Sequence, residues 1–478
     1  MCTSAVTKKV LLIMFLKHSP KILLLFICIF CHSLASADNR PNIIVINVDE
    51  LRWDGLSISG HPFVETPNID RIAREGMLME NSFVTTPLCG PSRGCMMTGQ
   101  YAHTNGSYKN QAPKGHTKLL KTYPMLFQKA GYKTAFIGKW TTGRQADKTP
   151  HPGFDRWFCS GVNRDLKMNP AVNVDGEWIQ YMGHATDIDS DEAVRFIREN
   201  KDVPFNISLW HRSVHTSYGE EDLLAAERNQ ELYKDQPIER RKSAQPGFVV
   251  QPSLKGFAQR PPTDEDIRNI ARMTVDIDDG VGRIYEALKE EGILDETMII
   301  FVGDNGFFFG EHGLTEKRLA YEESIRVPFF VRYPPLIEAG SRSEVGVLNI
   351  DIAPTLLALA GIKIPAEMQG QDLLPVFEGG QLEEPRESLL FEFWSETDLP
   401  GQSPWWKAVR TDRWKYVHYY KEPFYDELYD LKNDPYEMNN LIKSKKHLDT
   451  VEQMEGELKR LMDKHDDQGA PYNFWKNL

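Results

Sequence analysis

Apolar and polar residues follow two different periods along the chain. Residues 42–48 form a short, β-branched and almost continuously apolar run, and residues 298–302 form another. Runs of this kind are expected of central parallel strands that are covered on both faces. Ahead of the second run, Ile277, Val281 and Ile284 repeat at helical spacing, which predicts an amphipathic helix. A helix that leads into a buried strand is typical of an α/β fold.

The predicted strands end in polar residues. Two further apolar runs, 134–137 and 205–209, join the two above, and each run leads into ionisable or amide side chains. These side chains are Asp49 and Glu50, Lys139, His211 and His215, and Asp304 and Asn305. In an open α/β sheet, ligands bind beyond the carboxyl ends of the strands. We therefore predict that these residues meet at one edge of the sheet and form an active site.

Four of these residues, Asp49, Glu50, Asp304 and Asn305, carry hard oxygen donors. Such donors suit Ca²⁺ or Mg²⁺ and argue against a zinc site, which is built on Cys and His. An acidic pair at a strand end could instead cap a helix or lie in a solvated turn. Because several elements converge, we predict a metal site with one Ca²⁺ ion, and Mg²⁺ is the second choice.

The N-terminal segment predicts export. Four lysines precede an apolar run over residues 22–30, and small residues over 34–37 match a signal peptidase site. We predict a signal peptide over residues 1–37 and a periplasmic or extracellular protein. A membrane anchor is the alternative, but the apolar core is shorter than the roughly 20 residues of a spanning helix. Lipidation of Cys31 is a minor alternative because no small residue precedes it.

The chain is large and acidic. It has 478 residues and a formal charge of −12, and removal of residues 1–37 would take away lysines and no acids. An acidic surface repels polyanions at long range, which argues against a nucleic-acid partner. The length suits one large domain with a smaller appendage. Beyond residue 37 only Cys89, Cys95 and Cys159 remain, and the last two either form one disulfide or stay reduced.

We predict two domains after the signal peptide. Residues 38–378 would form a catalytic α/β domain with a large, mixed, mostly parallel sheet sandwiched by helices. Residues 379–478 would form a smaller α+β domain, because aromatic and polar residues alternate near Phe391 and Trp414 as in an antiparallel sheet, and residues 451–462 suit a helix. Four more aromatic residues either wall a carbohydrate cleft or pack in the core; they are Trp405, Trp406, Tyr419 and Tyr420.

The segment 89–99 combines a potential nucleophile with a turn that suits an anion. Pro91 favours the first turn of a helix, which places Ser92 and Arg93 where free backbone N–H groups and the positive end of the helix dipole face an anion. An isolated Cys89 would more often be a small buried hydrophobic residue. The surrounding residues, however, read Cys-x-Pro-Ser-Arg-x4-Thr-Gly.

This pattern is the signature of the type I sulfatases, which belong to the alkaline-phosphatase superfamily, and the chain resembles that family over nearly its whole length after residue 37. The matching segments are 41–54, 89–106, 131–140, 304–314, 321–324, 409–416 and 427–435. The resemblance implies hydrolysis of sulfate monoesters. It also implies that a formylglycine-generating enzyme oxidises Cys89 to formylglycine (3-oxoalanine), whose hydrate attacks sulfur.

The resemblance also assigns roles to single residues. Asp49, Glu50, Asp304 and Asn305 would bind the metal together with the modified Cys89. The sulfate would be held by Arg93, Lys139, His215 and Lys317, and His215 would protonate the leaving oxygen or orient the sulfate. There are two departures from the family pattern. Glu50 stands where the family usually has Asp, and Thr141 stands where it commonly has His, so the base that releases sulfate stays open. His103 is interpreted as structural.

Three functions compete. The favoured one is an exported sulfatase that acts on a sulfated polysaccharide or oligosaccharide. A phosphomonoester or phosphonate hydrolase on the same scaffold is the first alternative, and the complete cysteine motif argues against it. A catalytically silent glycan-binding homologue is the second, and the retention of Arg93, Lys139 and Lys317 argues against it. The sequence predicts neither the sugar nor the position of the sulfate.

Overall fold

The computed structural model describes residues 40–110, 120–140, 149–160, 167–215, 224–245, 262–394, 404–420 and 425–467. The predicted signal peptide and Thr141 lie outside these residues. Residues 41–478 group into one compact unit. Among the described residues, no helix has both the length and the apolar character needed to cross a membrane.

A ten-stranded, mostly parallel sheet forms the centre of this unit. Its middle strands are neighbours in the order β9, β1, β8, β4, and they run parallel. Their bounds are Thr297–Gly303, Asn42–Val48, Phe205–His211 and Lys133–Lys139. These are the four strands predicted from apolar runs, and their carboxyl ends lie at one edge of the sheet.

Shorter strands extend the sheet on both sides. Beyond β4 lie β5, β6 and β7, with bounds Arg156–Ser160, Ala171–Val174 and Glu177–Gln180. Beyond β9 lie β12, β2 and β13, with bounds Phe329–Arg332, Met77–Met79 and Ser341–Ser343. Strand β12 pairs antiparallel with β9, so the sheet is mixed.

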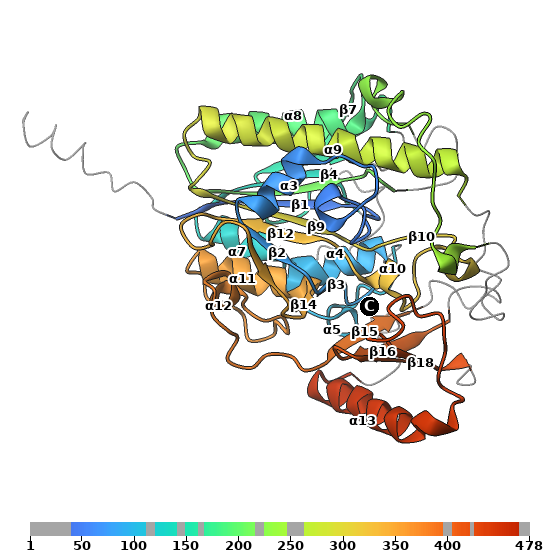
Figure 1. Ribbon diagram of the computed structural model, residues 1–478. Helices are drawn as coiled ribbons and strands as arrows, with labels where there is room; N and C mark the ends of the chain where they lie inside the picture. The colour runs from blue at the N-terminus through green and yellow to red at the C-terminus, as the bar shows by residue number, and fades with distance from the viewer. Residues whose placement is uncertain are drawn as a thin grey trace, which may run out of the picture. The chain divides into compact units, whose positions relative to one another are not determined.

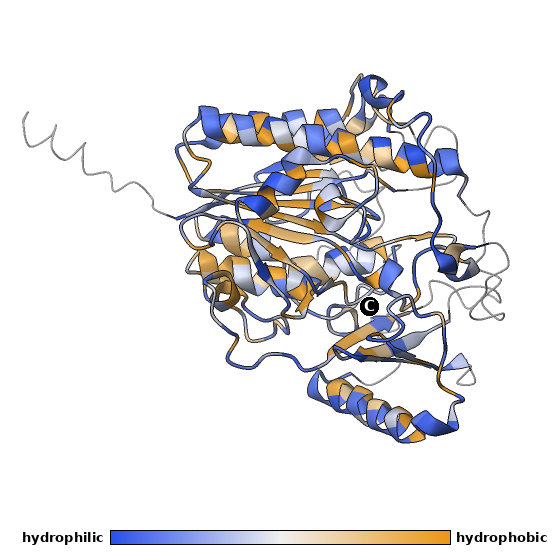
Figure 2. Cartoon of the chain, in the orientation of Figure 1, coloured by the Kyte–Doolittle hydropathy of each residue, from blue (hydrophilic) through white to orange (hydrophobic). Residues whose placement is uncertain are grey.

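Helices cover both faces of the sheet (Figure 1). One face carries α3 (Pro67–Arg74), α8 (Ala185–Asn200) and α9 (Asp264–Glu290). The opposite face carries α4 (Cys89–Thr98), α7 (Tyr123–Lys129), α11 (Ile352–Leu359) and α12 (Leu374–Phe377). Figure 2 shows hydrophobic strands at the centre, a mixture of hydrophilic and hydrophobic residues on α8 and α9, and largely hydrophobic helices on the opposite face. This layering buries the central strands on both faces, as their continuous apolar runs predict.

A four-stranded antiparallel sheet follows near the C-terminus, in the order β15, β16, β17, β18. Its strands span Leu389–Phe393, Trp406–Arg410, Trp414–Tyr419 and Glu427–Asp430, and α13 (Leu448–Lys464) packs on it. The sheet is joined to the segment ahead of α4, because the Glu392 N–H donates to the Thr85 carbonyl at 2.9 Å. The predicted fold class is confirmed, and the domain boundary at residue 378 stays a prediction.

Six short elements lie outside these two sheets. They are β3 (Ser82–Phe83), β14 (Val347–Leu348), β10 (Phe308–Phe309), β11 (Thr315–Glu316), α5 (Ala102–Asn105) and α10 (Glu322–Ile325). Four of them pair as two small two-stranded sheets, β10 with β11 and β14 with β3. Strands β10 and β11 pair antiparallel as a small ribbon just before Lys317.

Two expectations from the sequence are settled by burial. Trp406 and Tyr419 are 1% and 0% exposed, so of the two alternatives core packing is the one found for these residues, which lie in the core of the C-terminal sheet. Trp405 and Tyr420 are half-buried. Cys95 and Cys159 are buried free thiols, so of the two alternatives the reduced state is the one found.

Candidate active site

The predicted site residues meet at the carboxyl edge of the central sheet. Asp49 and Glu50 follow β1, Asp304 and Asn305 follow β9, Lys139 ends β4, and His215 follows β8 by a short loop. Cys89 and Arg93 come from α4, and Lys317 follows β11. All of these residues except His215 are nearly fully buried. His211 is buried on β8, and neither of its ring nitrogens has a hydrogen-bond partner among the described residues.

The fixed positions of the cysteine motif shape α4. Cys89 is its first residue, and the Ser92 N–H donates to the Leu88 carbonyl at 2.9 Å. The Ser92 hydroxyl accepts from Asn349 Nδ2 at 2.9 Å, and the Thr98 hydroxyl donates to the Gly94 carbonyl at 2.8 Å. Gly99 ends the helix with φ +66°, a left-handed conformation that glycine adopts without strain. The motif therefore fixes Cys89 at a helix N-terminus that opens onto the strand ends.

Acids and bases alternate around Cys89. Lys139 Nζ lies 2.7 Å from Asp49 Oδ2, and Cys89 Sγ lies 3.3 Å from Asp49 Oδ1. Arg93 bridges two acids, because its Nε lies 2.7 Å from Asp304 Oδ2 and its NH2 group lies 3.2 Å from Asp49 Oδ2. The same guanidinium donates to the Lys139 carbonyl at 2.5 Å. Arg93 is thus a buried cross-link between β1, β4 and β9.

Glu50 occupies a second group of contacts. Its backbone has φ +62°, which is uncommon for a residue with a side chain. The Glu50 N–H donates to Asp304 Oδ1 at 3.1 Å. Its carboxylate pairs with Lys317 Nζ and lies 3.3 Å from His215 Nε2. Glu50 therefore lies in one cluster with Asp304, Lys317 and His215.

The cluster perturbs the pKa values of its members in opposite directions. Burial would raise the pKa of Asp49, but Lys139 and Arg93, with His215 and Lys317, hold it well below its usual range. Burial and the charge of Asp49 raise the pKa of Asp304 to about 7, against the pull of Arg93 and Lys139. Asp49 is therefore the more strongly ionised of the two carboxyl groups.

Cys89 and His215 are both shifted toward their neutral forms. Burial, with the charges of Asp49 and Asp304, raises the pKa of the Cys89 thiol well above its usual range. Burial, with the charge of Lys139, lowers the pKa of His215 well below its usual range. A thiol with a raised pKa is a poor nucleophile, because the thiolate is the reactive form. The site is therefore badly suited to an unmodified cysteine.

The oxygen donors fit a hard divalent cation. Ligand atoms of Asp49, Glu50, Cys89 and His215 all lie within 4.8 Å of one another. Asn305 Nδ2 donates to the Gly306 carbonyl at 2.9 Å, while its buried Oδ1 has no hydrogen-bond partner within the described parts of the chain. A buried amide oxygen of this kind, beside carboxylates, is a donor set that Ca²⁺ and Mg²⁺ prefer. Asp49, Glu50, Asp304 and Asn305 would hold such an ion.

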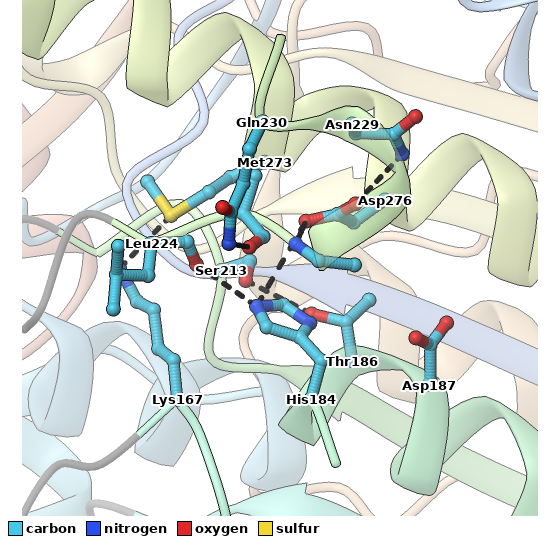
Figure 3. Close-up of polar contacts among 12 residues, drawn as sticks. Lys167, His184, Thr186, Asp187, Ser213, Leu224, Asn229, Gln230, Met273 and Asp276 are labelled. Carbon is cyan, nitrogen blue, oxygen red and sulfur yellow. Dashed lines mark hydrogen bonds and ion pairs between the residues drawn. The ribbon is translucent and has the colours of Figure 1, made fainter.

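A polar network holds the loop that carries His215, and Figure 3 shows its members Lys167, Ser213 and Thr186. The buried Lys167 donates to the His215 carbonyl at 2.7 Å and lies 3.1 Å from Met273 Sδ. Two residues earlier, the Ser213 hydroxyl shares a 2.9 Å hydrogen bond with the Thr186 hydroxyl of α8. The loop is therefore attached on both sides, which limits where the His215 ring can lie.

Sequence reasoning missed two supporting residues. Lys167 lies in a polar stretch, where a lysine is usually solvated, so no local signal marks it. Arg52 lies just after the acidic pair and is 4% exposed, and it pairs with Asp54 at 2.9 Å and with Glu311 at 2.6 Å. The signal that could have marked Arg52 is its closeness in sequence to the predicted site residue Asp49. Arg52 ties the loop after β1 to the loop after β9.

Comparisons with known proteins agree with this geometry. The sulfatase family model matches residues 41–362, and the model for the C-terminal part of N-sulphoglucosamine sulphohydrolase matches residues 310–464. An N-acetylglucosamine-6-O-sulfatase of Bacteroides thetaiotaomicron is 31% identical and covers 89% of this chain and 88% of its own length. The N-acetylgalactosamine-6-sulfatase of Homo sapiens is 29% identical and covers 73% of this chain and 68% of its own length.

A solved structure of a protein in complex with its substrate D-glucosamine-2-N,6-O-disulfate has a TM-score of 0.82 and 27% identity. It covers 91% of this chain and 100% of its own. Together these matches show that the chain belongs to the type I sulfatases, within the alkaline-phosphatase superfamily. The protein is a sulfuric ester hydrolase.

Proposed function

We propose that this protein is an exported sulfatase that removes a 6-O-sulfate group from an amino sugar of a sulfated glycan. The observation that carries the proposal is the convergence of Asp49, Asp304, Lys139, His215 and Lys317 around Cys89. A sulfate monoester is a stable anion, so its hydrolysis needs positive charge, an in-line nucleophile and a proton for the leaving oxygen. This cluster contains a candidate for each.

The nucleophile in this proposal is Cys89 after conversion to formylglycine by a formylglycine-generating enzyme. The complete cysteine motif and the raised pKa of the thiol support it. The hydrated aldehyde would supply a hydroxyl that attacks sulfur and a second hydroxyl whose deprotonation releases sulfate. Asp49 Oδ1, 3.3 Å from Cys89 Sγ, is placed to orient the group at this position.

A bound Ca²⁺ ion, with Mg²⁺ as the second choice, would neutralise negative charge at the nucleophile and the sulfate. Asp49, Asp304 and Asn305 are the proposed ligands, and Glu50 is the fourth. Lys139 and Lys317 now pair with Asp49 and Glu50, so they lie within reach of the same point and would hold the sulfate oxygens. Arg93 keeps both aspartates in place through its bridge.

His215 is the proposed donor of a proton to the leaving oxygen. Its Nε2 faces Glu50 at 3.3 Å, and its loop is held by Lys167 and Ser213. Burial and Lys139 hold the pKa of His215 well below its usual range, so proton donation would depend on a bound sulfate, whose negative charge favours the protonated imidazole. The base for sulfate release is not assigned, because Thr141 lies outside the described residues.

The proposed sugar rests on the relatives. Two of them are named as 6-sulfatases of N-acetylhexosamines, and the solved structure holds a glucosamine with a 6-O-sulfate. We expect the protein to desulfate N-acetylglucosamine 6-sulfate or a 6-O-sulfated glucosamine faster than 2-, 3- or 4-O-sulfated sugars. Sulfate release from a panel of defined saccharides tests this, with a Cys89→Ala variant as the matched blank.

The panel also contains an aryl sulfate and the matching aryl phosphate. Preference for a 2- or 4-O-sulfated sugar would remove the proposed position and keep the sulfatase. Faster hydrolysis of the phosphate than of every sulfate ester would overturn the proposed substrate class. Export is tested separately, because fractionation of expressing cells should place the mature protein outside the cytoplasm with residues 1–37 removed.

A further inference from the structure

Lys317 lies on a strained loop. We call residues 315–320 the lysine loop. Glu316 and Arg318, on either side of Lys317, have φ +75° and +87°. Left-handed backbone is unfavourable for a residue with a side chain, and such conformations persist only where the surroundings impose them. Some part of the protein must therefore hold this loop against relaxation.

The C-terminal sheet supplies the restraint. The indole Nε1 of Trp406 donates to the Arg318 carbonyl at 2.8 Å. Lys415, on the next strand, donates to the Ala320 carbonyl at 2.8 Å. Both donors come from strands of one sheet, β16 and β17, which pair antiparallel. The lysine loop is thus attached to the sheet at two carbonyl groups just after Lys317.

The indole is more than a space-filling group. Trp406 is 1% exposed and its ring stacks on Phe393 with centroids 6.2 Å apart. Packing alone would be served by any large apolar residue, but a buried indole N–H needs an acceptor. The acceptor here is a carbonyl in the strained loop, one residue after the lysine that pairs with Glu50.

We infer that Trp406 is a positioning residue for Lys317. It fixes the Arg318 carbonyl, and through it the backbone conformation from which the Lys317 side chain reaches the strand ends. The inference rests on the proposed function in one respect, since Lys317 acts on the sulfate there. By this inference the C-terminal sheet helps to build the active site, a role that the sequence pattern does not indicate.

The test removes the donor and keeps the ring. Trp406→Phe deletes the indole N–H, and replacement of Trp406 by benzothienylalanine deletes it with the bicyclic shape retained, in case the phenylalanine variant folds poorly. Loss of one hydrogen bond should reduce kcat/KM for a sulfate ester by about 2- to 12-fold. The matched control is Trp414→Phe, because Trp414 lies on the same sheet and its ring contacts Arg413 and His447.

A double-mutant cycle separates positioning from general stability. In a Lys317→Met background, Trp406→Phe should change kcat/KM by less than about 2-fold, because the group that it positions is gone. An equal loss in both backgrounds would show that Trp406 acts through the fold as a whole and would overturn the inference. No loss in the wild-type background would overturn it as well.

Hydrogen exchange provides a readout that needs no substrate. Amides over residues 315–320 should exchange faster in Trp406→Phe than in wild type or Trp414→Phe, while β1 and β9 stay unchanged. If the wild-type protein hydrolysed no sulfate ester, the proposed function would fail, and exchange would still decide the anchoring. Unchanged exchange over the lysine loop would overturn the inference by itself.

Discussion

Two buried clusters in this protein bring acids and a histidine together, yet they are built for different purposes. The strand-end cluster is Asp49, Glu50, Cys89 and His215. The anchor cluster is His103, Glu392 and Asp467, together with Lys407. In both clusters the possible ligand atoms lie close enough together to hold a metal ion.

In the anchor cluster both ring nitrogens of the histidine have partners, and the acids pair with a lysine. His103 Nδ1 lies 2.8 Å from Glu392 Oε2, and His103 Nε2 lies 3.0 Å from the His465 carbonyl. Lys407 Nζ pairs with Asp467 and lies 3.2 Å from Glu392 Oε2. These residues come from α5, the C-terminal sheet and the end of α13, so the cluster joins three elements. His103 is structural, as the sequence analysis interprets it.

The strand-end cluster keeps polar atoms without partners. His215 Nδ1, and Asn305 Oδ1 of the neighbouring loop after β9, are buried and make no hydrogen bond to any part of the chain that the structure describes. Unsatisfied buried polar atoms cost free energy, so proteins retain them where a ligand or a reaction needs them. The two histidines show the difference: both ring nitrogens of His103 have hydrogen-bond partners, whereas His215 Nδ1 has none among the described residues. Ligand types and distances alone do not separate the two clusters.

Removal of the nucleophile should have the largest effect. Cys89→Ala should lower sulfatase activity by at least about 10⁴-fold, since a reaction without its nucleophile falls to residual catalysis. The variant should keep its circular dichroism spectrum. Mass spectrometry of the peptide containing residue 89 in active wild-type protein should show an aldehyde or its hydrate, and active protein with an intact thiol would contradict the mechanism.

The second test compares the two clusters directly. Asp304→Asn should lose the bound cation and about 10²–10³ in kcat, because a charged group at the reacting centre is removed. Glu392→Gln, in the anchor cluster, should keep both the cation and kcat. Elemental analysis after dialysis measures the ion. Stoichiometric zinc, or loss of the ion in Glu392→Gln, would break the distinction.

Stability should respond in the opposite way. Lys407→Met leaves Glu392 and Asp467 buried without their cation, and removing one partner of a buried ion pair typically costs about 3–5 kcal/mol. The thermal midpoint should fall accordingly while kcat of the folded protein is preserved. Lys443→Met, at an exposed lysine, is the control and should stay within about 0.5 kcal/mol. An equal loss of stability in Lys407→Met and Lys443→Met would show that the ion pairs of Lys407 do not stabilise the protein more than an exposed lysine does.

The smallest expected effect is a pH dependence of the anchor cluster. Burial opposes ionisation of Glu392, but His103 and Lys407 lower its pKa from 4.5 to about 2. A carboxyl whose pKa is lower in the folded state stabilises the protein above its unfolded pKa, and the contribution is lost as pH falls. The gap in unfolding free energy between wild type and Glu392→Gln should therefore close by about 3 kcal/mol from pH 5 to pH 2. A constant gap would contradict this origin.

The sequence predicts the central strands well because burial on both faces leaves an uninterrupted apolar run. Strand β1 has the predicted bounds of 42 and 48. The edge strands β2 and β13 have three residues each, too few to show a period. The family motif predicted Cys89 and Arg93 as site residues. Their burial and their pairing with acids follow from the packing of α4, which the motif does not give.

Contacts between distant segments lie beyond local patterns. Lys317 and Glu50 are 267 residues apart, and the sequence around either residue does not indicate that their side chains pair. The role of Trp406 was missed for the same reason, because an aromatic residue in a polar, aromatic-rich strand suits a sugar platform as well as a core. The fold decides between those two outcomes through the sheet to which the strand belongs.

The burial of α4 also limits when Cys89 is accessible to another enzyme. Every residue of this helix is buried, and Cys89 itself is 1% exposed. In the finished fold the Cys89 side chain is closed off from any modifying enzyme. If Cys89 is converted as proposed, its oxidation would therefore precede the folding of this region. Strand β15, whose Glu392 later holds the Thr85 carbonyl, is synthesised long after this segment, so the order of synthesis keeps that interval open.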